Sequence, residues 1–256
     1  MSKQLASLNA RFVQGQPSSN ASQAGVLIRM FDRDDTESDE PWLPCRAPRW
    51  CASLGNRMIT SLVSMRLPHV SKEGSLGMVL SAAHSRIRCS FFADFGTMRR
   101  VCAADSPPGC EPGCCDSYGR PNWCGDPASE GKEIYGCAFR PSDLNAMLRH
   151  HQLQAKPVAN NVVIDPTSWV LDSHTTAPVA IEAFFFIRDP EAEAEHAFRE
   201  SFRPSPGRSL ASKTPRDGEA KAREIHARFL RRYPSTPVPL LRLELNQLER
   251  PFTRVA

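Results

Sequence analysis

Residues 181–187 (IEAFFFI), 217–233 (DGEAKAREIHARFLRRY) and 238–245 (VPLLRLEL) decide the fold of this chain. The first segment is a near-continuous apolar run, which is typical of a strand buried on both faces. The second predicts an amphipathic helix and the third another strand. The stripe that faces the core in this helix consists of Ala222, Ile225, Phe229, Leu230 and Tyr233. Strand, connection with a helix, and strand form a crossover unit, so a partly parallel sheet is expected.

The chain before this unit supplies further elements. Residues 77–80 and 87–92 are predicted as two strands that a polar Ala-His-Ser connection joins in a hairpin. A short helix is expected after Pro141, and residues 162–165 predict a β-branched strand that ends before Pro166. Apolar spacing places one face of that helix on Leu144, Met147, Leu148 and His151. We therefore predict one α/β domain over residues 74–252, with a small mixed, partly parallel sheet and flanking helices.

Residues 1–73 are predicted to be a poorly ordered leader. The acidic run over residues 32–40 lies among Gly, Pro and Ser and offers little apolar surface to bury. The apolar segment from Met58 to Leu67 is short and is compatible with either a helix or a strand. The first 25 residues lack the apolar stretch that a signal peptide needs, so either the chain is intracellular or its true start lies upstream.

Residues 102–137 form a cysteine-rich loop that carries six of the nine cysteines of the chain. Pro-Pro-Gly and Pro-Gly turns separate them, and a loop this polar cannot fold by burial alone. We therefore expect disulfides to stabilise it. Two alternatives stay open, namely a bound metal, although no C-x2-C pair is present, and free thiols in a reducing compartment. The candidates are Cys102, Cys110, Cys114, Cys115, Cys124 and Cys137.

Cys89 lies outside this loop on a predicted strand. It is the candidate odd thiol, although a buried or bridged cysteine is the more common state for such a position. Disulfides would place the protein in the secretory lumen or outside the cell, with a signal sequence upstream of residue 1.

Several segments taken in order resemble a group of uncharacterised cysteine-rich proteins of dinoflagellates and related algae. The resemblance covers about residues 76–252 and implies one contiguous domain and an algal origin. It carries no catalytic residue onto any position here. The segments are GMVLSAAHSRIRCSFFADFGT, the loop ending in NWC, YGCAFRPSDLNAML, NNVVIDPTSW, IEAFFF, EAKAREIHARFLRRY and VPLLRLEL.

Asp165 and Glu182 are the candidate catalytic pair. Asp165 is expected at the carboxyl end of a strand, where open α/β sheets present ligand-binding groups. Two carboxylates that lie close together can perform acid–base catalysis or hold a divalent ion. The alternative is that Asp165 caps a turn with Pro166 and that Glu182 begins a strand outside the core.

Three histidines carry weaker signals. His150 and His151 are adjacent near the end of a predicted helix, where a cationic imidazole would suit the helix dipole better than a shared metal ion. His226 lies next to the apolar stripe of its helix and is predicted to be a boundary residue. The basic residues from Lys221 to Arg232 would bind phosphate or sulfated sugar, or else form a solvated helix face.

Composition and missing motifs limit the function classes. The net charge is only +4 and the basic residues are scattered, so there is no strong signal for nucleic-acid binding, and no apolar run is long enough for a membrane span. Partners are unknown. There is no G-x-S-x-G, P-loop or G-x-G-x-x-G motif, so no cofactor and no metal site are predicted.

We expect a disulfide-stabilised domain that acts by binding or protein interaction. The alternative is a transferase or hydrolase for a sugar or nucleotide-linked substrate that uses Asp165 and Glu182.

Overall fold

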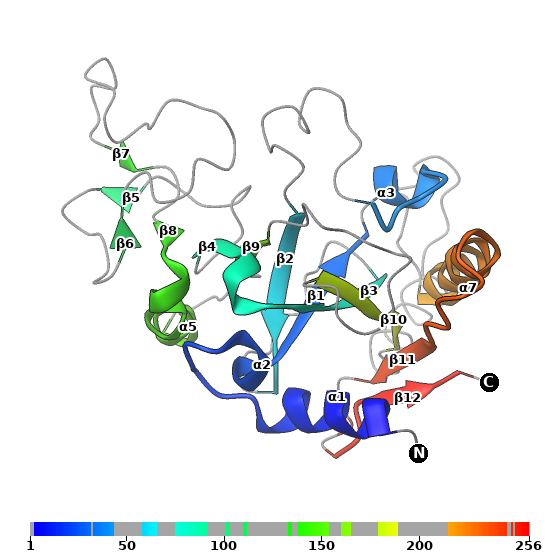
Figure 1. Ribbon diagram of the computed structural model, residues 1–256, viewed down its shortest axis with the longest axis horizontal. Helices are drawn as coiled ribbons and strands as arrows, with labels where there is room; N and C mark the ends of the chain where they lie inside the picture. Colours follow the sequence, from blue (N-terminus) through cyan, green and yellow to red (C-terminus); the bar gives the residue numbers. More distant parts are fainter. Residues whose placement is uncertain are drawn as a thin grey trace, which may run out of the picture.

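The structure is a computed structural model that describes residues 3–31, 33–43, 58–65, 75–91, 101–102, 110–111, 133–134, 138–153, 160–164, 179–188, 215–244, 247 and 249–255. Helices and strands in these ranges form a layered α/β fold (Figure 1). The helices are α1 (Lys3–Gln14), α2 (Ala21–Ala24), α3 (Arg33–Glu37), α5 (Leu144–Gln152) and α7 (Pro215–Arg232), with 3-10 turns at His84–Arg86 and Pro141–Asp143. The strands are β1 (Val26–Met30), β2 (Met58–Val63), β3 (Leu76–Ala82), β4 (Ile87–Phe91), β5 (Val101–Cys102), β6 (Cys110–Glu111), β7 (Glu133–Ile134), β8 (Ala138–Phe139), β9 (Asn161–Ile164), β10 (Val179–Arg188), β11 (Leu240–Glu244) and β12 (Phe252–Arg254).

Ten of these strands form one mixed sheet in the order β12-β11-β10-β3-β1-β2-β9-β4-β8-β6. Within the described strands, β10 and β11 pair in parallel and the other neighbours in this sheet pair antiparallel. Strands β5 and β7 form a separate two-stranded ribbon. The predicted mixed, partly parallel sheet with flanking helices is confirmed.

The crossover unit is formed by β10, α7 and β11. Phe184 of β10 pairs with Leu240 of β11, and α7 lies in the connection between these strands. The helix turns Ala222, Ile225 and Phe229 into the core, each at most 1% exposed. This unit was predicted from the 3.6-residue spacing of those three side chains and the apolar runs on either side of them.

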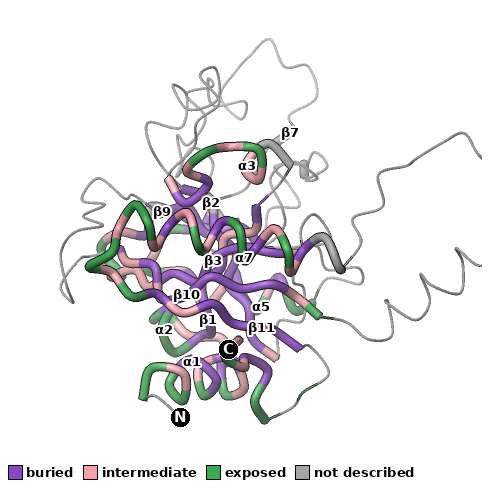
Figure 2. The backbone as a smooth tube through the Cα atoms, turned by 90° about the vertical axis from the view of Figure 1, so that its right-hand side faces the viewer, coloured by how far each residue is buried: buried purple, intermediate pink, exposed green. Residues whose placement is uncertain are grey.

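The sheet has an apolar core on each face because β10 is buried on both sides. Phe184 and Phe186 belong to the core beneath α7, whereas Ala183 and Phe185 belong to the core beneath α1. Successive side chains of a strand point to opposite faces, so a run of apolar residues supplies both cores. Figure 2 shows the buried strands between α1 on one side and α7 on the other.

The expectation of a poorly ordered leader is wrong for the part of residues 1–73 that the structure describes. Strands β1 and β2 lie in the middle of the sheet, and β1 is paired on both edges. Helix α1 buries Leu8 and Phe12 against the sheet, and Phe12 meets Phe252 edge to face at 5.5 Å. Strand β1 is only five residues long. The polar segments on either side lower the apolar content of this part of the chain, so its composition does not reveal the strand.

Two other expectations are resolved by strand pairing. Residues 58–63 form a strand, β2, so the ambiguity between helix and strand ends there. Strands β3 and β4 exist as predicted, but the hairpin between them is wrong. The edges of β3 are taken by β1 and β10, and β4 pairs with β9 and β8. The 3-10 turn at His84–Arg86 carries the chain from one part of the sheet to the other.

Candidate functional site

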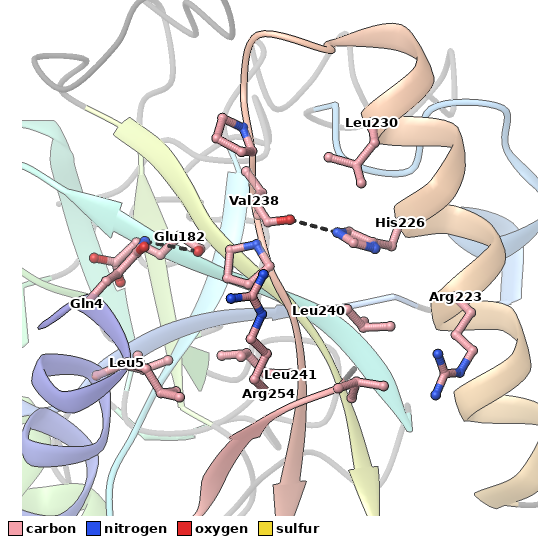
Figure 3. Close-up of a pocket in the computed structure, with 14 residues that line it drawn as sticks. Gln4, Leu5, Glu182, Arg223, His226, Leu230, Val238, Leu240, Leu241 and Arg254 are labelled. Atoms are coloured by element: carbon pink, nitrogen blue, oxygen red, sulfur yellow. Dashed lines mark hydrogen bonds between the residues drawn. The ribbon is translucent and has the colours of Figure 1, made fainter. Parts of the chain in front are cut away.

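A groove of about 520 Å³ lies where β10 and β11 begin and β12 ends, between α1 and α7 (Figure 3). We call it the edge groove. It lies at the amino ends of the parallel pair, opposite to the carboxyl-end location that open α/β sheets usually use. Its lining comes from both helices and from the chain that leads into β11. The lining residues are Gln4, Leu5, Leu8, Glu182, Arg223, His226, Leu230, Pro237, Val238, Pro239, Leu240, Leu241, Arg254 and Val255.

The segment Pro237–Val238–Pro239 forms one wall of the edge groove. Proline has no backbone N–H, so these two prolines cannot donate to a neighbouring strand. Ladder pairing of β11 accordingly begins only at Leu240. Val238 is 6% exposed, and its N–H donates to the carbonyl of Thr236 at 2.9 Å. Its own carbonyl oxygen lies 2.7 Å from Nε2 of His226, and this contact joins the wall to α7.

Glu182 lies in the edge groove at a β-bulge. Ile181 pairs with Leu80 and Ala183 pairs with Val79, so Glu182 is the extra residue between two pairs. Its carboxylate forms an ion pair with Arg11 of α1, and its carbonyl accepts a hydrogen bond from Nε2 of Gln4 at 3.2 Å. Bulges often re-aim a side chain next to a functional site, and here the bulge turns a carboxylate toward α1. The expectation that Glu182 begins a strand is wrong, because β10 starts at Val179.

Asp165 lies outside the described residues, so the structure does not place the candidate pair. The residue before it, Ile164, ends β9, which lies four strand positions from β10 in the sheet. At about 4.8 Å per strand this corresponds to about 19 Å measured along the sheet.

His226 faces the edge groove from α7. Its Nε2 lies 2.7 Å from the carbonyl oxygen of Val238. A carbonyl oxygen can only accept, so Nε2 carries a proton and donates it in this contact. The ring also packs against Phe184, with a centroid separation of 5.8 Å. The predicted boundary position is confirmed, since the side chain is half-buried between the groove and the core.

Two arginines at the edge groove differ in their surroundings. The guanidinium of Arg223 donates to Glu219 one turn away, with Nη2 2.8 Å from Oε1. Arg254 is exposed at the end of β12 and has no hydrogen bond or ion pair with the residues that the structure describes. Arg254 therefore contributes an uncompensated positive charge at the groove.

The basic face of α7 is tied to acidic residues and to the chain around α3. Lys221 pairs with Glu224 at 3.0 Å. Arg228 donates to the carbonyl of Ser38 at 3.0 Å, and Arg232 lies 3.7 Å from Glu40. These contacts favour the solvated, internally paired helix face over a phosphate site.

His150 and His151 lie in the last turn of α5, and the predicted buried face of Leu144, Met147, Leu148 and His151 is confirmed. His151 is 1% exposed. Partial burial lowers the pKa of His150 below its ordinary value. This desolvation disfavours the charged imidazole and so weighs against the expected cationic helix end, which stays a prediction.

Cys89 is fully buried on β4 and is disulfide-bonded. It is thus not the odd thiol of the chain. The side chains of the six loop cysteines lie outside what the structure describes.

Among described residues, no group of three or more His, Cys, Asp or Glu is placed to hold a metal ion. None of the helices in the described part of the chain is long and apolar enough to cross a bilayer.

Compared with models of known protein families, with curated proteins and with solved structures, the chain matches none. The resemblance to algal cysteine-rich proteins stays a prediction. The fold and the edge groove define the chain as an α/β protein with a candidate ligand site at one end of its sheet.

Sequence reasoning found Glu182 and His226 but missed most of the edge groove. Gln4 and Arg11 lie on α1, which was assigned to the leader, and Arg254 lies beyond the predicted domain end at residue 252. The signal that could have located α1 is the spacing of Leu5, Leu8 and Phe12, which marks one helix face.

Proposed function

We propose that this protein acts by binding, and that the edge groove takes a small ligand with an extended apolar part. The observation that carries this proposal is the make-up of the groove: apolar side chains from both helices and the sheet, with a few polar groups among them. A volume of about 520 Å³ is within the range of about 300–1,000 Å³ typical of ligand sites.

The walls of the edge groove belong to regular elements with buried anchors. Leu8 of α1 is 3% exposed, and Leu240 and Leu241 of β11 are 6% and 2% exposed. A site on such elements is largely formed before the ligand arrives, which lowers the entropy lost on binding. Each Å² of apolar surface that the ligand buries contributes about 25 cal/mol, so an apolar chain is the natural occupant.

The enzyme alternative rests on Asp165 and Glu182 and has no described contact in its favour. The carboxylate of Glu182 is held by Arg11, which suits a positioning or structural role better than proton transfer. Asp165 lies outside the described residues. We therefore propose binding over transferase or hydrolase chemistry.

We also propose that disulfides stabilise residues 102–137, which would fit a setting outside the reducing cytosol. The bridge at Cys89 is compatible with this proposal, because disulfides persist mainly in oxidising compartments. Thiol counting by mass spectrometry before and after reduction tests it. One free thiol among nine cysteines is the expected result, and nine free thiols or bound zinc would overturn it.

The edge groove is tested with the neutral apolar fluorophore 1-N-phenylnaphthylamine and the full chain. Leu230→Glu places a charge in the groove and is expected to weaken binding by about tenfold or more. Leu153→Glu is the matched control, because Leu153 is 81% exposed on the chain after α5 and does not line the groove. Circular dichroism confirms that both variants fold. Equal loss in both variants, or no saturable binding to the parent chain, would overturn the proposal.

A further inference from the structure

We infer that the ligand of the edge groove is a monocarboxylic acid with an apolar body, and that Arg254 binds its carboxylate. This inference rests on the proposed function and adds the chemical class of the ligand. Its evidence is the charge balance of the groove, the position of Arg254 and the apolar floor beside that residue.

The charges around the edge groove leave one cation unmatched. Glu182 is neutralised by Arg11, and Arg223 is neutralised by Glu219. His226 has its Nε2 engaged by the carbonyl of Val238. Among the described lining residues, the guanidinium of Arg254 has no such partner. One positive charge beside an apolar surface matches a ligand with one negative charge at the end of an apolar body.

The backbone of Arg254 is held in the sheet, although its side chain is exposed. Its backbone pairs with Leu241, and the neighbouring residue Val255 donates its N–H to the carbonyl of Leu240 at 3.1 Å. Figure 3 shows the Arg254 side chain beside Leu241, between the α1 side of the groove and the α7 side. A ligand carboxylate at this guanidinium would therefore have its apolar part over the leucines of the groove.

The chemistry of the guanidinium favours a carboxylate. Its planar set of N–H donors matches the two oxygens of a carboxylate and forms paired, charge-assisted hydrogen bonds. A phosphate monoester carries up to two negative charges and would require more than one free cation. The second arginine of the lining is already paired with Glu219, so it does not supply a second free cation. A monoanion is thus the best electrostatic match.

The test measures displacement of 1-N-phenylnaphthylamine from the full chain by dodecanoic acid and by dodecanol at neutral pH, where the acid is ionised. We expect the parent chain to bind the acid about tenfold more tightly than the alcohol. Arg254→Met should bring the affinities for the acid and the alcohol to within about twofold of each other. Its affinity for the alcohol should not fall. Arg254→Lys should retain part of the preference, because it keeps the charge and loses the paired geometry.

Arg223→Met is the matched control, since this arginine also lines the edge groove but is paired with Glu219. It should keep the preference for the acid. Equal affinity of acid and alcohol for the parent chain would overturn the inference and leave the proposed function standing. Loss of preference in Arg223→Met with retention in Arg254→Met would also overturn it. Failure of the neutral fluorophore to bind would instead refute the proposed function.

Discussion

Asn9 of α1 pairs with the backbone of Phe252 of β12 through both ends of its side-chain amide. Nδ2 donates to the Phe252 carbonyl at 2.9 Å, and Oδ1 accepts from the Phe252 N–H at 2.8 Å. Within the described sheet, β12 is the last strand on this side, so the amide occupies the place that a further strand would take. The unpaired N–H and C=O groups of an open sheet edge can pair with another chain. Asn9 satisfies both of these groups at Phe252.

Replacing Asn9 by Ala should destabilise the protein by about 2–4 kcal/mol, because both polar groups of Phe252 would lose their partners in a buried place. Asn9 itself is 4% exposed, so water does not readily substitute for it. Urea unfolding measures the change. Ser7→Ala, at an exposed position of the same helix, is the control and should stay within about 0.5 kcal/mol of the parent. A similar loss in both variants would show that the effect belongs to α1 as a whole.

Asn160 makes the same two-way contact with Leu62 inside the sheet. Its Oδ1 accepts from the Leu62 N–H and its Nδ2 donates to the Leu62 carbonyl, both at 2.8 Å. Asn160→Asp keeps an acceptor but places a carboxylate against the carbonyl, so stability at pH 7 should fall by about 2 kcal/mol or more. Protonation restores a donor, and the stability difference from the parent should therefore shrink as the pH is lowered. Urea unfolding across pH checks this, and a constant difference would contradict it.

These two asparagines show where sequence reasoning reaches its limit. The crossover from Phe184 through Ile225 to Leu240 was predictable because local apolar spacing encodes it. Asn9 and Phe252 are 243 residues apart, and Asn160 and Leu62 are 98 apart. A polar residue in the core has no local periodic signal, since its reason for burial is a partner that only the fold supplies.

The edge groove illustrates the same limit. Glu182 was found as a carboxylate on a strand, but its position at a bulge follows from the register of β10 with β3. Arg11, which neutralises it, comes from a helix 171 residues earlier in the chain. The charge balance of the site therefore could not be derived from any one segment.

Gly77 of β3 lies where the backbone of β1 approaches closely. A Cβ at this position would lie 2.1 Å from the carbonyl oxygen of Arg29, a backbone atom that cannot rotate away. Gly77→Ala should therefore destabilise the protein by about 2 kcal/mol or more, through displacement of the β1–β3 pairing. Urea unfolding gives the value. Ser81→Ala, farther along the same strand, should have little effect, and equal stability of the two variants would show that β1 adjusts freely.

His150 should make the protein less stable in acid. Partial burial lowers the pKa of His150 in the folded state, whereas the unfolded chain keeps the ordinary value of about 6.5. The unfolded state then binds more protons, so stability falls as the pH decreases from about 6.5 through the lowered pKa. His150→Gln should remove this part of the pH dependence, measured by urea unfolding at several pH values. His84→Gln, at an exposed position, should not remove it.

Trp42 packs the segment around α3 against α7, the helix of the crossover unit. Its ring meets Phe229 at 5.3 Å, Tyr233 at 6.2 Å and Phe184 at 6.4 Å, each nearly edge to face. Trp42→Ala would leave a large cavity between α7 and the sheet, so a loss of about 3–5 kcal/mol is expected.

The same substitution should weaken the contact of Arg228 with the Ser38 carbonyl, because Trp42 holds the segment that carries Ser38. Hydrogen exchange should therefore rise first in residues 33–43, and Trp42→Phe should lose less stability than Trp42→Ala. Arg232→Ala removes only the 3.7 Å contact with Glu40 and is the control for this segment. If Arg232→Ala raised hydrogen exchange in residues 33–43 as much as Trp42→Ala does, the ion pair with Glu40 would hold this segment in place and the aromatic contacts of Trp42 would not.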